Sequence, residues 1–179
     1  MLVSLLAVLG AALVSPTRAV LPRHAFPAAA SINDAQILGA LSILNAAMIE
    51  AAELGSSKAS SQAVRDYANM LLSDHRASQQ EGDTLAMRLG ITPALPPDKS
   101  MASEHIETMA RLNQRSGAAF DRAFMEAMVE DHERVISTVN ADLLPKASNA
   151  ELKAFILKLQ PTLNKHEQVG REWLDSHKS

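Results

Sequence analysis

Cysteine is absent from this chain of 179 residues. Disulfide bonds, thiolate metal ligands, a catalytic thiol and a lipidated N-terminal cysteine are therefore excluded. Aromatic residues are also scarce, at 3%, although hydrophobic residues make up 47% of the chain. The apolar residues are mostly Ala, Leu, Ile, Val and Met, and Ala, Leu and Met are strong helix formers. The composition therefore predicts a helical protein.

The chain has no concentration of positive charge. It contains 17 Lys and Arg residues against 20 Asp and Glu residues, which gives a formal net charge of −3. A protein that binds nucleic acid needs a cluster of Lys and Arg to neutralise phosphates, and none is present. We therefore expect no nucleic-acid partner.

Recognisable catalytic motifs are missing as well. There is no Gly-x-Ser-x-Gly sequence, the pattern that carries the nucleophile of many serine hydrolases. No pair of carboxylates recurs at inward-facing helical positions. The sequence therefore gives no reason to predict an enzyme.

The N-terminus resembles an export signal. Residues 2–14 are almost entirely apolar, and this run is too short to span a bilayer comfortably. Small residues at 15–19 fit a signal-peptidase cut after Ala19, and residues 28–30 offer a second cut. No Lys or Arg precedes the apolar run, which departs from the usual pattern. We predict a signal peptide at residues 1–19, a flexible lead-in at 20–30, and export to the periplasm or cell envelope.

The rest of the chain, residues 31–176, shows helical periodicity. Helices are expected from residues 31–34 to 58, then over 62–89, 100–116, 119–144 and 149–175. In the first of these, Ile37, Leu41, Leu44 and Met48 repeat at spacings of 4, 3 and 4. Four long amphipathic helices predict an all-α four-helix bundle, with an extra short helix between the second and third long ones. None is apolar on all sides, so no membrane span is expected after the signal.

Three histidines occupy positions that otherwise hold core residues. His75, His132 and His166 each lie in the apolar seam of a different long helix. A buried imidazole must satisfy both of its nitrogens, and three of them can do so by sharing a metal ion. Zinc, iron, copper or manganese would suit such a site. Glu50 on the first helix is a candidate fourth ligand, although helix lengths place it about 7 Å from the level of His75.

A second interpretation needs no metal. A histidine in a helix seam is often hydrogen-bonded to a neighbouring side chain or to water. Asp74 and Asp131, each directly before one of these histidines, are either solvated charges or acceptors for an imidazole on an adjacent helix.

Several segments resemble a large bacterial family of exported helical proteins. These segments are Lys-Ala-Ser at 58–60, Met-Leu-Leu-Ser-Asp-His at 70–75, Phe-Asp-Arg-Ala-Phe at 120–124, Met-Val-Glu-Asp-His at 128–132, Leu-Lys-Ala-Phe at 152–155 and Leu-Asn-Lys-His at 163–166, together with Val64, Tyr67 and Ala68. The family has a ferritin-like fold and no settled function, and its members are often labelled outer-membrane proteins. The resemblance implies a ferritin-like bundle in the periplasm or envelope.

The resemblance does not imply iron storage. The Glu-x-x-His pairs of di-iron proteins are missing, because the residues three before the core histidines are Leu72, Val129 and Leu163. Two hypotheses remain open. In the first, an exported ferritin-like domain binds one transition metal and serves in metal handling or envelope stress. In the second, a non-catalytic envelope module contains structural or pH-sensitive buried histidines. The metal hypothesis requires the three imidazoles to converge.

Overall fold

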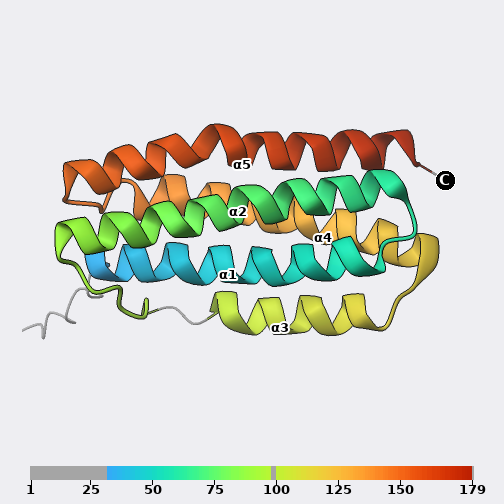
Figure 1. The fold of residues 1–179 in the computed structure, drawn as a ribbon, viewed down its shortest axis with the longest axis horizontal. Helices are drawn as coiled ribbons and strands as arrows, with labels where there is room; N and C mark the ends of the chain where they lie inside the picture. The colour runs from blue at the N-terminus through green and yellow to red at the C-terminus, as the bar shows by residue number, and fades with distance from the viewer. Residues whose placement is uncertain (1–31, 98–99, 179) are drawn as a thin grey trace, which may run out of the picture. The chain divides into compact units, whose positions relative to one another are not determined.

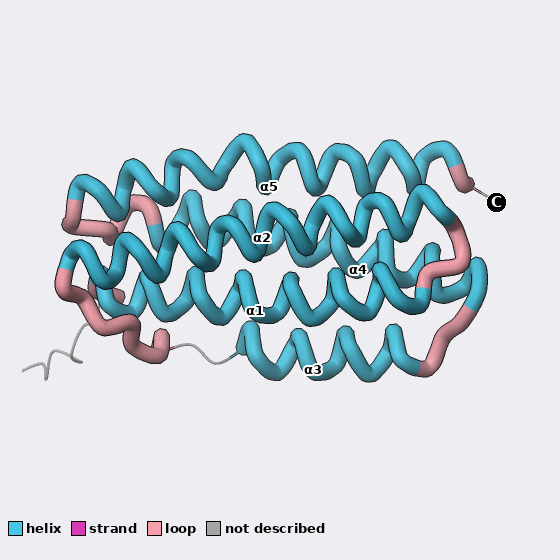
Figure 2. The backbone as a smooth tube through the Cα atoms, in the orientation of Figure 1, coloured by secondary structure: helices cyan, strands magenta, loops and turns pink. Residues whose placement is uncertain are grey.

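The computed structural model describes residues 32–97 and 100–178. The expected signal peptide at 1–19 and lead-in at 20–30 lie outside these residues. Throughout the described ranges the ordered elements are helices, which confirms the all-α prediction (Figures 1 and 2). They are α1 (Asp34–Lys58), α2 (Gln62–Leu89), α3 (Ser100–Asn113), α4 (Gly117–Thr138), a π-helical turn η1 (Val139–Leu143) and α5 (Ala150–Ser176).

The helix ends form where the sequence provides capping groups. At the start of α1, Asn33 accepts a hydrogen bond from the Gln36 backbone, and the Gln36 side chain accepts one from the Asn33 backbone. Asn149 caps α5 by accepting from two backbone N–H groups. Gly90 ends α2 in the left-handed conformation at φ 65°, which glycine adopts without steric cost.

The region around α3 and α4 differs from the expectation. Helix α3 ends at Asn113 rather than residue 116, and α4 begins at Gly117 rather than 119. The α-helical part of α4 ends at Thr138, and the last turn widens so that Leu144 N donates to Val139 O, five residues back. This π-helical turn buries both Val139 and Leu143.

The long helices pack as two antiparallel pairs. Helix α1 packs on α2 and α4 packs on α5, and the pairs meet through α1 with α4 and α2 with α5. The end of α2 and the start of α4 lie at opposite ends of the bundle, so α2 and α4 run in the same direction (Figure 1). Helix α3 lies alongside α1 and also contacts α4.

Two aspartates tie the pairs together in the same way. Asp121 at the start of α4 accepts hydrogen bonds from Ser60 N, Ser60 Oγ and Ser61 N, just before α2. Asp34 at the start of α1 accepts from Ser148 N, Ser148 Oγ and Asn149 N, just before α5. We call these the two aspartate clasps. Each clasp caps one helix of the opposite pair, so together they fix the lengthwise register between pairs.

The interior consists of two apolar clusters with a polar layer between them. One cluster contains Leu71, Phe124 and Met128, and the other contains Ile37, Leu85 and Ile156. Each long helix has one buried polar residue between the two clusters: Asn45 on α1, His75 on α2, His132 on α4 and His166 on α5. The register of the helices therefore brings one polar residue from each to the same level.

Helix α1 is long and apolar enough to cross a membrane by length and composition alone. Half of its most apolar stretch is buried inside the protein, with Ala51 and Ala52 fully covered. Its packing against α2, α3 and α4 gives a second explanation of its composition, that of a core helix.

Candidate metal centre

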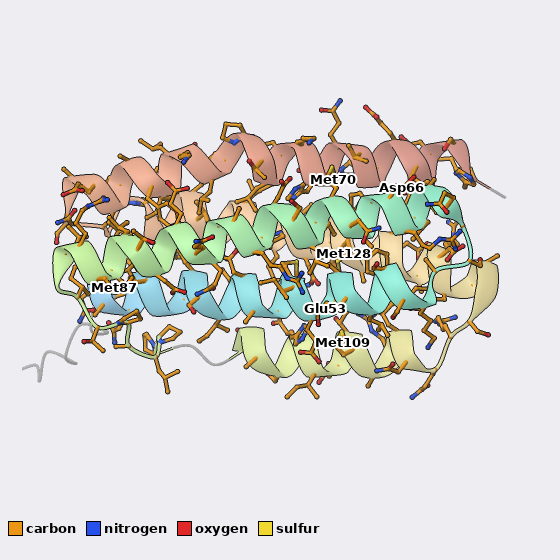
Figure 3. All side chains as sticks on the ribbon, in the orientation of Figure 1. Glu53, Asp66, Met70, Met87, Met109 and Met128 are labelled. Carbon is orange, nitrogen blue, oxygen red and sulfur yellow. The ribbon has the colours of Figure 1, made fainter. Side chains whose placement is uncertain are left out.

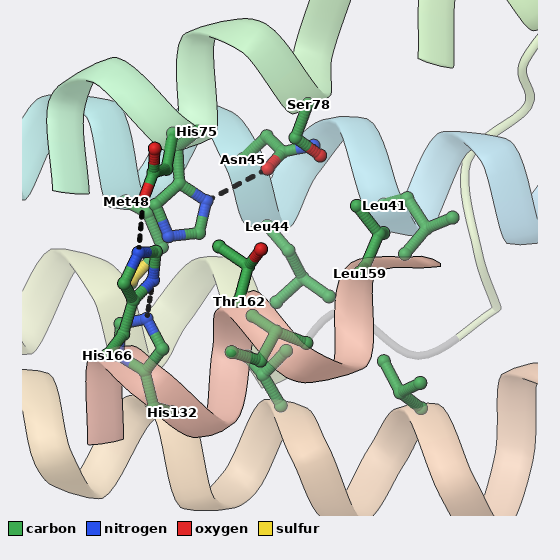
Figure 4. Close-up of a pocket in the computed structure, with 14 residues that line it drawn as sticks. Leu41, Leu44, Asn45, Met48, His75, Ser78, His132, Leu159, Thr162 and His166 are labelled. Atoms are coloured by element: carbon green, nitrogen blue, oxygen red, sulfur yellow. Dashed lines mark hydrogen bonds and ion pairs between the residues drawn. The ribbon is translucent and has the colours of Figure 1, made fainter. Parts of the chain in front are cut away.

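The three histidines meet in the interior. Their ring centroids lie 5.7 Å apart for His75 and His132, 5.3 Å for His75 and His166, and 5.1 Å for His132 and His166. Each offers one ring nitrogen that lies within 4.8 Å of the other two. The side chains are almost completely buried, with 6% of His75, 1% of His132 and none of His166 exposed. The structure thus brings together three predicted ligands from three helices (Figure 4).

Each imidazole is also held by a hydrogen bond at one ring nitrogen. His132 Nδ1 lies 2.7 Å from Met128 O, and His166 Nε2 lies 2.9 Å from Asp74 Oδ2. His75 Nδ1 lies 3.0 Å from Asn45 Oδ1, and Asn45 Nδ2 donates to Ser78 Oγ. All three partners are acceptors, so these ring nitrogens carry the protons. In the neutral rings, His75 Nε2, His132 Nε2 and His166 Nδ1 therefore present lone pairs.

These three lone pairs lack donors within the described residues. His132 Nε2 and His166 Nδ1 are 3.2 Å apart, so in neutral rings two lone pairs face each other. A hydrogen bond between them requires an additional proton, which gives the cluster a positive charge. His75 Nε2 is buried and has no hydrogen-bond partner. A cation shared by the three nitrogens satisfies all of them at once.

Burial keeps the rings neutral. Burial, together with the nearby His132 and His166, lowers the pKa of His75 to about 3. Burial lowers the pKa of His132 to about 4, against the opposing effect of the bond to Met128 O. Burial also lowers the pKa of His166, although Asp74 opposes the change. Neutral imidazole is the form that binds metal, so the site is in its binding form at pH 7.

A small cavity adjoins the histidines. Its volume is about 40 Å³, more than the minimum that one water molecule needs. Apolar side chains of α1, α4 and α5 form much of its wall, whereas α2 contributes polar residues, and polar groups also contribute at Asn45 and Thr162 (Figure 4). A cavity of this size beside the rings can hold a small ligand such as a water molecule.

The structure places Glu50 away from the three histidines. Its Oε2 lies 2.9 Å from His105 Nε2 on α3, and its side chain is 63% exposed. Helix α1 turns this residue toward α3, whereas Asn45 and Met48 line the cavity. Glu50 therefore lies outside the histidine cluster.

The two aspartates that precede histidines differ in role. Asp74 accepts from the imidazole of His166 on an adjacent helix, one of the two roles that the sequence left open. Asp131 instead pairs with Arg134 on its own helix. Asn45 is not among the predicted site residues, because the apolar seam predicted for α1 passes through its neighbour Leu44. The alternative seam of Leu41, Asn45, Met48 and Ala52 has the same helical spacing and places Asn45 inward.

Comparison with known proteins assigns the chain to a protein family. A family model described as Domain of unknown function (DUF4142) matches residues 19–172. The chain belongs to this family. The matched range includes His75, His132 and His166 together with Asn45 and Asp74. No curated protein and no solved structure matches the chain.

Proposed function

We propose that this protein binds one transition-metal ion in its interior through His75 Nε2, His132 Nε2 and His166 Nδ1. One observation carries the proposal: the three inward nitrogens present lone pairs to one another, while each ring's outer nitrogen donates to an acceptor. In metal sites, histidine ligands are held by acceptors of this kind, which fix the tautomer and orient the ring.

The spacing of the nitrogens supports a tetrahedral ion. Two nitrogens that each lie about 2.0–2.1 Å from a tetrahedral ion are roughly 3.3 Å apart. The separation of His132 Nε2 and His166 Nδ1, 3.2 Å, agrees with this value. The widest separation is at most 4.8 Å, so the rings need to close by about 1.5 Å or less.

The arrangement of the helices supports a ferritin-like four-helix bundle as the scaffold. In that fold one long crossover connection makes the second and third long helices parallel, and metal ligands project inward from facing helices. Helices α2 and α4 are parallel here, as such a crossover requires, and α3 lies between them in the chain. The residues three before the histidines are Leu72, Val129 and Leu163, so the site lacks the carboxylates of a di-iron centre. We therefore propose one ion and not a pair.

The biological role that fits is metal handling or envelope stress in the periplasm or cell envelope. The predicted signal peptide supports export, and the burial of the ligands favours retention of an ion over rapid exchange with solvent. Under this proposal α1 belongs to the protein core and is not a membrane span.

The second candidate function is a helical module whose buried histidines are structural or pH-sensitive. The bonds of the rings to Asn45, Met128 and Asp74 favour it, since they exist without an ion. The inward lone pairs of His75 Nε2, His132 Nε2 and His166 Nδ1 favour the metal-binding candidate instead, because no donor among the described residues reaches them.

Metal titration of the stripped protein distinguishes the two. Wild-type protein, freed of metal with a chelator, is titrated with Zn²⁺, Cu⁺, Fe²⁺ and Mn²⁺, and bound ion is measured by elemental analysis. We expect about one ion per chain for at least one metal and a melting temperature that rises with its concentration. His132→Gln removes a ligand at similar volume and is expected to lose both effects. His105→Gln, which changes a histidine outside the cluster, is the control and should keep both. Stripped wild type that binds none of the four ions would support the metal-free module.

A further inference from the structure

Helix α1 brings a thioether to the histidine layer. Met48 lies one helical turn after Asn45, is 5% exposed and lines the same cavity as His75, His132 and His166 (Figure 4). Helices α2, α4 and α5 each contribute one imidazole to this layer. At the same level α1 supplies Asn45, which already holds His75, and Met48, whose Sδ is a potential metal ligand.

This placement distinguishes Met48 from the other methionines described. Met70, Met87, Met109 and Met128, labelled in Figure 3, are not among the residues that form the cavity wall, and neither is Met125. Met87 is largely exposed at the end of α2, whereas Met125 and Met128 fill the apolar cluster beside the histidines. A general use of methionine as core filler explains Met125 and Met128. The position of Met48 beside three lone-pair nitrogens allows it a second role.

The charge of the site favours a monovalent ion. The donors are neutral imidazoles and a neutral thioether, and Asp74 is the carboxylate that accepts from one of these imidazoles. One positive charge at the centre is balanced by Asp74. A divalent ion leaves one net positive charge in a buried, largely apolar surrounding, which is unfavourable.

The chemistry of the donors points the same way. Thioether sulfur is a soft ligand that selects Cu⁺, whereas Mn²⁺ and Mg²⁺ prefer carboxylate and water oxygens. From these observations we infer that the ion of the proposed site is Cu⁺ and that Met48 Sδ is its fourth ligand. This inference rests on the proposed function, because it assigns the metal and one ligand of the same site.

Met48→Leu tests the assignment with a matched control. Leucine keeps most of the volume and removes the sulfur, so the fold should persist. Cu⁺ affinity is measured anaerobically by competition with a chromophoric Cu⁺ chelator, and Zn²⁺ affinity is measured in parallel. We expect Met48→Leu to weaken Cu⁺ binding on the order of 10–100-fold, the scale seen when a group that tunes a metal site is lost. Zn²⁺ affinity should change little. Met125→Leu, the same change in a methionine outside the cavity, should leave both affinities as in wild type.

X-ray absorption of the Cu⁺-loaded wild type gives a result that needs no variant. We expect one sulfur scatterer together with nitrogen scatterers in the first coordination sphere. Nitrogen scatterers alone, or a Met48→Leu variant that binds Cu⁺ as tightly as wild type, would overturn the assignment of Met48. A wild type that keeps Zn²⁺ against equimolar Cu⁺ would overturn the assignment of copper. Both of these outcomes leave the three-histidine site in place, whereas failure of the wild type to bind any ion contradicts the proposed function itself.

Discussion

At the scale of single residues, the site depends on where each ring proton points. Asn45, Met128 O and Asp74 each draw the proton to the outer nitrogen of a histidine, which leaves the inner nitrogens free to bind. The acceptors differ in strength, because Asp74 is a carboxylate and the other two are neutral carbonyl oxygens. The Asp74–His166 bond should therefore contribute most to the basicity of its ring.

Asp74→Asn and Asp131→Asn form a matched pair, since each residue directly precedes a core histidine. Asp74→Asn removes the charge that accepts from His166 Nε2, and we expect metal affinity to fall on the order of tenfold or more. Asp131→Asn changes a carboxylate paired with Arg134 and should leave the affinity unaltered. Titration of both stripped variants with the ion that wild type binds measures the difference. Equal losses in the two variants would show that Asp74 has no special role at the site.

The lowered histidine pKa values also predict how stability depends on pH. In the folded, metal-free protein the pKa is about 3 for His75 and about 4 for His132, whereas an unfolded histidine has a pKa of about 6.5. Between these values the unfolded chain binds more protons than the folded one. The free energy of unfolding is therefore fully retained above about pH 6.5 and falls as the pH drops toward 4.

Urea midpoints from pH 8 to pH 5, with and without chelator, check this prediction. With an ion bound, the loss on acidification should be larger, because protons also displace the metal from the imidazoles. His132→Gln should show a shallower decline than metal-free wild type. A midpoint that does not change with pH in the stripped wild type would contradict the burial of the histidines.

At the scale of helices, the bounds of the helices could be predicted from the sequence more accurately than the contacts between helices. Caps and breakers such as Asn149 and Gly90 act within one turn, so the ends of α1, α2 and α5 could be predicted from local sequence. The π-helical turn η1 follows from the packing of Val139 and Leu143 against other helices, and a local pattern does not contain that information. The placement of Glu50 toward α3 likewise depends on tertiary structure.

The aspartate clasps also depend on tertiary structure and could not be predicted from local sequence, since each joins residues at least 60 positions apart. Asp121 is 3% exposed, so Asp121→Ala removes a buried charged acceptor from the part-buried hydrogen bonds of Ser60 and Ser61. We expect a loss of about 2–4 kcal/mol in the free energy of unfolding. Asp34→Ala removes the more exposed clasp and should cost about 1 kcal/mol, as for an ordinary helix cap. Urea unfolding of the two variants measures both values, and a larger loss in Asp34→Ala would contradict the difference in burial.

At the scale of the whole molecule, a polar layer divides an otherwise apolar interior. Three of its members could be predicted because histidine is conspicuous in an apolar seam. Asn45 was hidden by the choice between two overlapping seams on α1, and the convergence of the rings depends on a register that the clasps fix. Such a layer lowers the apolar content of the core. An ion bound by these residues would explain why polar side chains occupy the core at this level.

Export is the second property of the whole molecule that can be tested. If residues 1–19 are a signal peptide, mass spectrometry of the protein from its native host should give an N-terminus near Val20 or Ser31. The measurement is made on periplasmic and cytoplasmic fractions separately. An intact Met1 in the periplasmic fraction would contradict cleavage.

The most direct test of the metal site is a crystal structure of the protein grown with the ion that it binds in titration. Diffraction data collected on both sides of that metal's absorption edge locate the ion by its anomalous signal. We predict one peak about 2.0–2.2 Å from His75 Nε2, His132 Nε2 and His166 Nδ1, with the outer ring nitrogens still bonded to Asn45, Met128 O and Asp74. A fully occupied peak elsewhere, or no peak among the three rings in protein shown to carry the ion, would contradict the account.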